Sequence, residues 1–201
     1  MLPYCMLGNL IESGFIVNVK ELEEAYPKTI LWFFAYPDKE FSLSELAEQL
    51  AISKTTANQI ITKLVKEGFL RKEVIGKVWR ISCNKNNKYN FTKKIAYNLL
   101  YIYSSDIIEK IHQLISNPRV IILFGSYRKG DDTEKSDLDI AVEVLDNEDL
   151  KIKQLGVIKK FGYRQNVVVN LHIFSRNKID LNLFSNIANG IVLEGFLEVR
   201  P

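Results

Sequence analysis

Short apolar runs separated by polar turns dominate the C-terminal half of the chain. Residues 120–124 form an unbroken apolar run of strand length, and residues 167–174 form a longer one. Apolar side chains also occupy every second position from Leu138 to Val144, which predicts a strand with one buried face. A helix over residues 181–188 and a last apolar strand follow. This half therefore predicts a mixed sheet with a few helices.

The N-terminal half shows helical spacing instead. Helices are predicted over residues 26–35, 45–50 and 54–67, with Ser44 and Ser53 as the N-caps of the second and third. A short turn joins the last two helices, as in a helix-turn-helix unit, whose second helix enters the DNA major groove.

A predicted β-hairpin follows these helices. Gly68 ends the third helix, and residues 69–81 read as two strands with a turn near Gly76. This hairpin has the position of the wing in a winged-helix domain. The segment from residue 24 to 83 resembles the winged-helix domains of prokaryotic transcription regulators, so a winged helix-turn-helix DNA-binding domain is expected over residues 24–87.

A long apolar helix is predicted between the two halves. Residues 88–116 show continuous helical spacing, and Tyr97, Tyr101 and Tyr103 widen the apolar face. So much apolar surface implies burial against both domains or against a second copy of the chain, and a homodimer would match two-fold DNA sites. Stacking of these tyrosines on nucleic acid is the alternative. The helical linker is expected over residues 88–117.

A glycine, a serine and two basic residues follow the first apolar run. Gly125 lets the backbone approach a ligand closely, and Ser126 adds a hydroxyl donor. Arg128 and Lys129 supply positive charge, and Gly130 closes the polar segment. A turn of this composition after a strand suits the phosphates of a nucleotide.

Two carboxylates follow, one residue apart. Asp137 and Asp139 alternate with Leu138, so they share the face opposite the buried one, about 6 to 7 Å apart along the strand. Such a pair repels itself and seldom serves packing, but its oxygens are ligands for Mg²⁺ bridging a triphosphate. Ser136 precedes the pair and is a further candidate nucleotide contact. The alternative is a hairpin with a solvated acidic face.

The Gly125-Ser126 turn and the Ser136-Asp137-Leu138-Asp139 segment resemble the signature of the polymerase-beta-type nucleotidyltransferase superfamily, most closely its minimal members. The resemblance implies that the turn holds a nucleoside triphosphate (NTP) and that the aspartates bind two Mg²⁺ or Mn²⁺ ions. It also implies a third carboxylate on a neighbouring strand. Residues 189–195 resemble the end of archaeal and bacterial minimal nucleotidyltransferases, so this domain is expected over residues 118–201.

The third carboxylate is where the sequence departs from that family. Asn170 stands at the expected position, and an amide oxygen can bind Mg²⁺ but cannot take a proton. His172 shares the same strand face and is a candidate base, although a hydrogen-bonded structural histidine is the alternative. Glu143 lies about 13 Å along the strand from Asp139 and is expected to be a solvated rim residue.

Charge is concentrated in the middle of the chain. Residues 1–52 carry 3 basic and 8 acidic side chains, residues 53–94 carry 11 and 2, and residues 95–201 carry 13 and 14. The basic middle coincides with the predicted recognition helix and wing, which favours DNA as a partner. A winged helix used only for protein contacts is the alternative. The candidate DNA contacts are Lys54, Thr55, Thr56, Asn58, Gln59, Lys63, Lys66, Arg71, Lys72, Lys77 and Arg80.

Composition excludes several other classes of protein. Cys5 and Cys83 are too few for a disulfide framework, which favours a reducing cytoplasm. Residues 1–19, within the N-terminal extension of residues 1–23, are rather apolar, but they lack a basic start and contain Glu12, so neither a signal peptide nor a membrane span is expected. No function is assigned to this N-terminal extension.

The expected fold class is α+β, and two functions remain open. The first is a Mg²⁺-dependent nucleotidyltransferase that binds DNA and transfers NMP to an acceptor hydroxyl, releasing pyrophosphate. The second is a winged-helix transcriptional regulator whose nucleotidyltransferase domain is catalytically degenerate and senses a nucleotide. The acceptor is not readable from the sequence. Some minimal family members modify a separate HEPN-type toxin, so a separate protein acceptor is one candidate.

Overall fold

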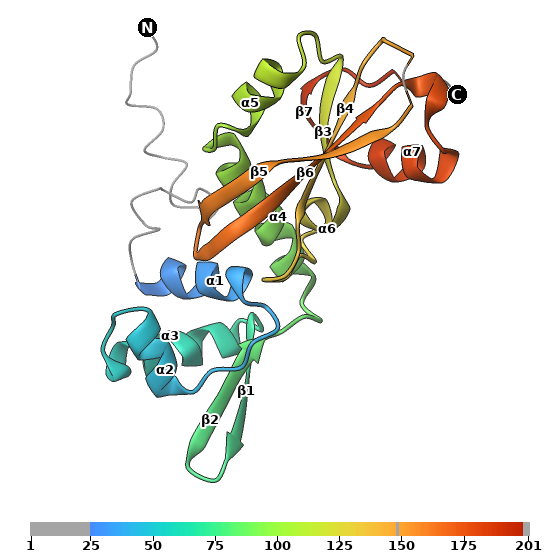
Figure 1. The fold of residues 1–201 in the computed structure, drawn as a ribbon. Helices are drawn as coiled ribbons and strands as arrows, with labels where there is room; N and C mark the ends of the chain where they lie inside the picture. Colours follow the sequence, from blue (N-terminus) through green and yellow to red (C-terminus); the bar gives the residue numbers. More distant parts are fainter. Residues whose placement is uncertain (1–24, 148, 199–201) are drawn as a thin grey trace, which may run out of the picture.

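The computed structural model describes residues 25–147 and 149–198, so the N-terminal extension with Cys5 lies outside the described residues. The N-terminal part holds three helices and a two-stranded antiparallel hairpin (Figure 1). Its elements are α1 (Ala25–Ala35), α2 (Leu43–Gln49), α3 (Lys54–Lys66), β1 (Leu70–Ile75) and β2 (Val78–Cys83). The expected helix-turn-helix unit and wing are therefore both present.

Helix α2 begins earlier than the sequence predicts. Its N-cap is Ser42 and not Ser44, because the backbone bridge between Phe41 and Ile81 keeps the chain extended up to Ser42. Ser42 and Glu45 form a capping box, in which each side chain accepts a hydrogen bond from the other residue's backbone N–H (3.2 and 2.7 Å). Ser53 is the N-cap of α3, as predicted, and accepts from the Thr56 backbone N–H at 3.0 Å.

The predicted long linker helix is in fact two helices. Helix α4 (Lys88–Tyr103) ends at a turn, and α5 (Ile107–Leu114) begins after it. The Ser104 and Ser105 hydroxyls donate to backbone carbonyls in the last turn of α4, and such local bonds compete with helix continuation. Apolar spacing alone did not reveal this break, because both helices carry the same kind of apolar face.

The C-terminal part is built on a five-stranded mixed sheet, in the order β5-β6-β4-β3-β7. Strands β4 and β6 are parallel, and the other neighbouring pairs are antiparallel. The strands are β3 (Val120–Phe124), β4 (Leu138–Glu143), β5 (Lys151–Phe161), β6 (Arg164–Phe174) and β7 (Ile191–Gly195). The remaining elements are α6 (Gly125–Lys129), η3 (Arg176–Lys178) and α7 (Leu181–Ala188).

The two faces of this sheet are covered differently. One face packs on α4 and α5 and shares a continuous core with the winged helix (Figure 1). The other face carries a smaller core that includes Ile122, Ala141 and Phe174, and α7 contributes Ile187 to it. This second face is the one that carries Asp139, because Asp139 lies two residues before Ala141 on β4 and so shares its face, and Ala141 belongs to the smaller core.

The tip of the β5–β6 hairpin joins the two parts of the chain. The hydroxyl of Tyr36, the residue after α1, donates to the Tyr163 carbonyl at 2.9 Å, and the rings of Trp32 and Tyr163 are 5.3 Å apart. Tyr97 of α4 lies in the same region and is 5% exposed, with its ring against Phe34. Tyr97 is therefore a packing residue and is too buried to stack on a nucleic acid base.

Candidate active site

Strand pairing brings the two aspartates and Asn170 together. Asp139 lies on β4 directly opposite Asn170 of the parallel strand β6, and Asp137 precedes β4 on the same face. The Asn170 amide Nδ2 lies 3.3 Å from Asp137 Oδ2 and 3.5 Å from Asp139 Oδ1. The structure thus places the Asn170 amide beside the two carboxylates, at the position where a third carboxylate would be expected.

His172 lies two residues after Asn170 on β6 and contacts the same site. Its Nε2 lies 3.4 Å from Asp139 Oδ1, and its side chain is only 12% exposed. The ring stands edge-on to Phe124, and Nδ1 is buried without a hydrogen-bond partner among the described residues. The imidazole therefore contacts the Asp139 carboxylate and the Phe124 ring.

Gly125 has a geometric role that the sequence did not reveal. Its φ is +72°, in the left-handed region, and a Cβ there would lie 2.9 Å from Asp139 Oδ2. The Asp139 carboxylate thus lies directly against the backbone of the Gly125-Ser126 turn. A phosphate held by this turn would lie next to the Asp139 carboxylate, because that carboxylate is against the backbone of the turn.

Of the other predicted nucleotide contacts, some line the turn and others hold the fold. Ser126, Arg128 and Lys129 lie in the single turn of α6, with Lys129 exposed. Gly130 is the C-cap of α6, and a Cβ there would lie 2.5 Å from a backbone oxygen of α4, so its role is packing. The Ser136 hydroxyl accepts from the Thr133 backbone N–H at 2.9 Å and closes the loop before the aspartates.

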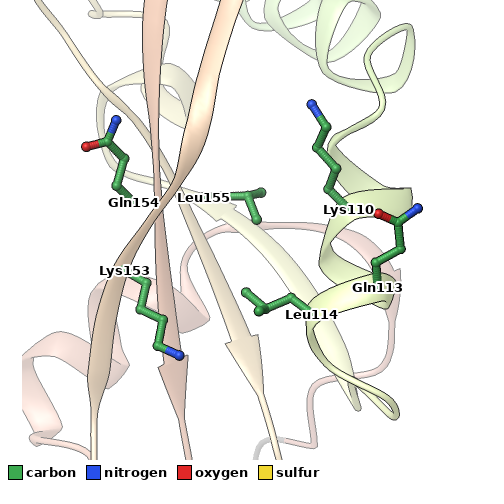
Figure 2. Close-up of a pocket in the computed structure, with 6 residues that line it drawn as sticks. All are labelled: Lys110, Gln113, Leu114, Lys153, Gln154 and Leu155. Atoms are coloured by element: carbon green, nitrogen blue, oxygen red, sulfur yellow. The ribbon is translucent and has the colours of Figure 1, made fainter.

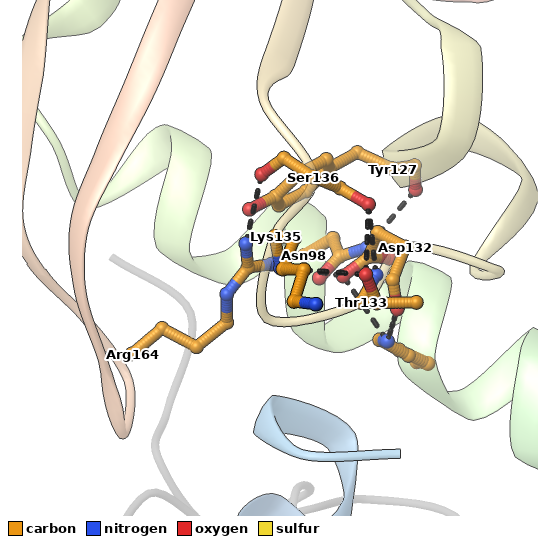
Figure 3. A network of polar contacts seen from close by, with 8 residues as sticks. Asn98, Tyr127, Asp132, Thr133, Lys135, Ser136 and Arg164 are labelled. Carbon is orange, nitrogen blue, oxygen red and sulfur yellow. Dashed lines mark hydrogen bonds and ion pairs between the residues drawn. The ribbon is translucent and has the colours of Figure 1, made fainter. Parts of the chain in front are cut away.

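A buried ionic network supports that loop, and it was not foreseen from the sequence (Figure 3). Asp132 Oδ2 lies 3.1 Å from Lys94 Nζ and 3.2 Å from Arg164 Nη1. Asn98 Nδ2 donates to the other oxygen of Asp132 at 2.8 Å, and Arg164 Nη2 donates to the Ser136 carbonyl at 2.8 Å. Asp132, Lys94 and Arg164 are each at least 95% buried. The only sequence signal was Asp132 itself, which has no place in the strand alternation.

Burial and pairing act in opposite directions on Lys94. Burial lowers the pKa of its ammonium group, while the Asp132 carboxylate raises it, and burial has the larger effect. The cluster holds two basic groups and one carboxylate, so Asp132 compensates the buried positive charges of both Lys94 and Arg164. This network ties α4, β6 and the loop that carries Asp137 into one unit.

The expectation for Glu143 was wrong. Glu143 is 1% exposed and not a solvated rim residue, because α7 and the C-terminal segment cover its end of the sheet face. Arg176 forms a two-pronged contact with its carboxylate, Nε at 3.0 Å and Nη2 at 3.3 Å. Arg119 lies 3.9 Å from the same carboxylate. Glu143 is thus a buried carboxylate that pairs with two partly exposed arginines outside the site.

The residues at the aspartate pair fit an oxygen-ligated divalent cation. The described residues contain no group of three or more Asp, Glu, His or Cys side chains placed to hold a metal ion. The set available is two carboxylates and the Asn170 amide, whose Oδ1 would face the aspartates after a half-turn of the amide plane. Carboxylate and amide oxygens are ordinary Mg²⁺ ligands. Neither aspartate is ion-paired with a lysine or arginine among the residues that the structure describes.

The candidate DNA contacts all lie on α3 and the wing, and most are exposed. Side chains at the start of α3 project from its first turns, although Thr56 also bonds the N-cap Ser53 through its hydroxyl (2.8 Å). Lys63 lies over the ring of Tyr26 and Lys72 over that of Trp79. The exposed candidates on α3 and the wing are Lys54, Thr55, Asn58, Gln59, Lys63, Lys66, Arg71, Lys77 and Arg80.

The wing carries both charge and exposed apolar side chains. Arg71 Nε donates to Asn84 Oδ1 at 2.9 Å, and Arg80 Nη1 lies 3.5 Å from Glu40. Both arginines are nevertheless exposed to solvent. Val74 and Val78 are more than half exposed near the wing tip. A basic hairpin with an exposed apolar tip is a surface suited to a nucleic acid groove.

A winged helix joined to a mixed sheet with a Gly-Ser turn and adjacent aspartates defines a helix-turn-helix domain fused to a nucleotidyltransferase domain. Comparison with known families agrees with this assignment. Residues 105–194 match the family described as polymerase beta, nucleotidyltransferase, and residues 29–74 match the IclR helix-turn-helix domain. A search of curated proteins found no match. Among the described residues, no helix is long and apolar enough to cross a membrane.

Proposed function

We propose that the protein binds DNA and transfers a nucleoside monophosphate from an NTP to an acceptor hydroxyl, with Mg²⁺ or Mn²⁺ as cofactor. The observation that carries this proposal is the Asp137–Asp139 pair. Asp139 lies against Gly125, and neither aspartate has a lysine or arginine partner among the described residues. Two such carboxylates left together on one face disfavour the folded state unless a cation joins them. A ligand is therefore the physical reason for their placement.

Each residue of the site has a role in this proposal. Asp137 and Asp139 hold the metal, and the backbone of Gly125-Ser126 with the Ser126 hydroxyl holds the triphosphate. Arg128 and Lys129 contribute positive charge beside the phosphates. The cation, when bound, would stabilise charge on the attacking and leaving oxygens.

The reaction requires a proton acceptor as well as a metal site. The acceptor oxygen forms a bond to the α-phosphorus, the bond to the pyrophosphate oxygen breaks, and the hydroxyl proton is lost. Asn170 cannot accept that proton, because an amide is not a base. We assign the proton to the Asp139 carboxylate, which His172 holds in place at 3.4 Å.

The second candidate function is a transcriptional regulator whose nucleotidyltransferase domain senses a nucleotide without transferring it. The amide of Asn170 favours this candidate, because it leaves the site one negative charge short for two divalent cations. In both functions the winged helix binds DNA through α3 and the wing. A homodimer would place two recognition helices on a two-fold site.

A transfer assay separates the two candidates. The full chain is incubated with Mg²⁺ and each of the four α-labelled NTPs, with DNA, RNA and protein fractions as acceptors. A separate protein such as a HEPN-type toxin belongs among those acceptors.

Label transfer that is lost in Asp137→Asn supports the enzyme. NTP binding without transfer to any acceptor supports the sensor and contradicts the enzyme. Asp131→Asn, an exposed aspartate on the preceding loop, is the matched control.

DNA binding is tested by its dependence on salt. The logarithm of the duplex affinity should fall linearly with the logarithm of salt concentration, because lysines and arginines displace counterions. Arg71→Ala and Arg80→Ala should each weaken binding and lower the slope by about one unit. An unchanged affinity in both variants would contradict a role for the wing.

A further inference from the structure

A shallow hollow of about 380 Å³ lies between β5 and α5 (Figure 2). Leu114 and Leu155 point into the space between helix and strand, and the other four lining residues are lysines and glutamines. All of the lining residues except Leu155 are exposed, so water can satisfy their polar groups. This hollow therefore has no polar group that requires a ligand.

A second cavity, of about 260 Å³, lies between the winged helix and the nucleotidyltransferase domain. Its walls come from the end of α1, the end of β2, the first turns of α4 and the loop after α6. Phe33, Phe34 and Phe91 line it, and Phe33 and Phe34 are only 0% and 4% exposed. Three phenylalanines give this cavity an apolar wall that suits the ring of a ligand.

Asn90 lines the same cavity with a buried acceptor atom that has no partner. The residue is 6% exposed, and its Nδ2 donates to the carbonyls of Phe69 and Asn84 at 3.0 and 2.8 Å. These carbonyls fix the orientation of the amide, because a half-turn would bring Oδ1 against them. Oδ1 is buried without a hydrogen-bond partner among the described residues. Such an acceptor is unfavourable in a folded protein unless a donor reaches it.

The charged groups around the cavity are either paired or exposed to solvent. Lys94 Nζ lies 3.1 Å from Asp132 Oδ2, and both side chains are buried. Lys85 is paired with Asp38 where both are partly exposed, and Asp131 is exposed. An ionic ligand would lose its hydration without finding an unpaired buried charge among these lining residues. The cavity therefore favours a neutral ligand.

The volume of the cavity limits the size of that ligand. One water takes up about 30 Å³, and the pockets of larger ligands have volumes of about 300 to 1,000 Å³. A cavity of about 260 Å³ is several times larger than one water and lies just below that range. A molecule of one or two rings fits a space of this size.

We propose that this cavity binds a neutral heteroaromatic molecule of one or two rings, whose N–H donates to Asn90 Oδ1 and whose ring packs against the three phenylalanines. This site is separate from the aspartate pair, and the inference does not rest on the proposed transfer function. It combines an apolar wall with one buried acceptor that fixes the orientation of the ring.

The ligand contacts both parts of the chain. Phe33 and Phe34 belong to α1 of the winged helix, whereas Thr133 belongs to the loop that leads to the aspartates. The Thr133 backbone N–H donates to the Ser136 hydroxyl at 2.9 Å, one residue before Asp137. A bound ligand thus holds α1 against the loop before the aspartate pair. This is the position of a regulatory site.

Calorimetric titration of the full chain with two probes of the same shape tests the hydrogen bond to Asn90. Indole carries a ring N–H, and benzofuran has an oxygen in its place. Indole should bind saturably and about tenfold more tightly than benzofuran, because benzofuran leaves the buried acceptor unpaired. Equal affinities would overturn the role of Asn90, and no saturable binding of indole would overturn the site. Asn90 itself is left unchanged, because its Nδ2 joins α4 to the backbone at Phe69 and Asn84.

A substitution in the wall locates the bound probe. Phe91→Ala should weaken indole binding about tenfold, since it removes one ring from the wall. Phe91→Leu, which keeps an apolar side chain, should weaken it less and serves as the test if Phe91→Ala does not fold. The matched control is Phe196→Ala, because Phe196 is 71% exposed and does not line the cavity. Wild-type affinity in both Phe91 variants, or an equal loss in Phe196→Ala, would place indole elsewhere and overturn the inference.

Amide hydrogen exchange tests whether the ligand connects the two parts of the chain. Indole should slow exchange both in residues 33–38 and in residues 130–133, because both segments line the cavity. Slower exchange in one segment alone would contradict a ligand that holds α1 against the loop. The measurement needs neither DNA nor an NTP, so its outcome is independent of the proposed function.

Discussion

Three aspartates lie within a segment of eight residues, 132–139, and their surroundings are opposite. Asp132 is 1% exposed and bonded to Lys94, Arg164 and Asn98. Asp137 is exposed and Asp139 is partly exposed, and their contacts are with an amide and an imidazole. The first carboxylate has its compensating charges inside the protein, and the other two do not.

This difference separates a structural carboxylate from a ligand-binding one. A buried charge must be paired, because an unpaired charge in the interior costs several kcal/mol. Two partly exposed carboxylates on one face can remain charged without a partner, at the cost of mutual repulsion. Substitutions should therefore affect stability at Asp132 and ligand binding at Asp137 and Asp139.

The largest effect is expected for Asp132→Ala. Removing this carboxylate leaves Lys94 and Arg164 buried without it, which should lower the free energy of unfolding by about 3 to 5 kcal/mol. Denaturant unfolding measures this change. Asp131→Ala, an exposed neighbour, should stay within about 0.5 kcal/mol of the wild type. Equal small effects in both variants would contradict a structural role for the buried network.

A moderate effect is expected for Gly125→Ala, on the ligand-binding side of the comparison. The left-handed φ and the contact with Asp139 should together cost about 1 to 3 kcal/mol of stability. The matched control is Gly76→Ala, because Gly76 also has a positive φ (+62°) but would have no neighbour within 4 Å of a Cβ. The difference between the two variants measures the contact with Asp139, and equal losses would show that backbone strain alone is responsible.

A smaller gain is expected for Asn170→Asp. A third carboxylate should raise the affinity for Mg²⁺ about tenfold, because each added negative ligand strengthens cation binding. Without metal the same variant should be less stable than the wild type, since three carboxylates then repel one another. Calorimetric titration with Mg²⁺ measures the first effect. A lower Mg²⁺ affinity in Asn170→Asp would mean that position 170 does not face the metal.

The smallest effect is expected at the exposed C-terminal ion pairs. Hydrogen bonds from Arg119 and Arg176 lower the pKa of the Glu198 carboxyl group. A lowered carboxyl pKa stabilises the fold above the ordinary carboxyl range, and this contribution is lost as pH falls through the lowered value. Glu198→Gln should thus be slightly less stable than the wild type at neutral pH and equal to it in strong acid. A difference that persists in acid would point to packing instead.

Local pattern was sufficient to predict much of the fold. Alternation around Leu138 placed Asp137 and Asp139 on one face, and the second apolar run placed Asn170 and His172 beside them. The helix-turn-helix unit followed from helical spacing and from Ser53. These predictions needed only the periods of strands and helices and one capping residue.

The features that the sequence did not reveal depend on contacts between distant segments. Glu143 shares a face with Asp139, but only the position of α7 shows that its end of the sheet is covered. The pairing of Asp132 with Lys94 and Arg164 joins residues 30 or more positions apart. Periodicity carries no information about such contacts, so the buried network and the buried Glu143 could only be found in the structure.

The most direct test of the aspartate pair is thermal unfolding with and without Mg²⁺ and an NTP. The wild type should melt at a higher temperature when both ligands are present, because a ligand that binds only the folded state stabilises it. Asp137→Asn and Asp139→Asn should melt near or above the ligand-free wild type and show no shift with ligand. A lower melting temperature in these variants, with the ligand shift retained, would contradict a ligand-binding role for the pair.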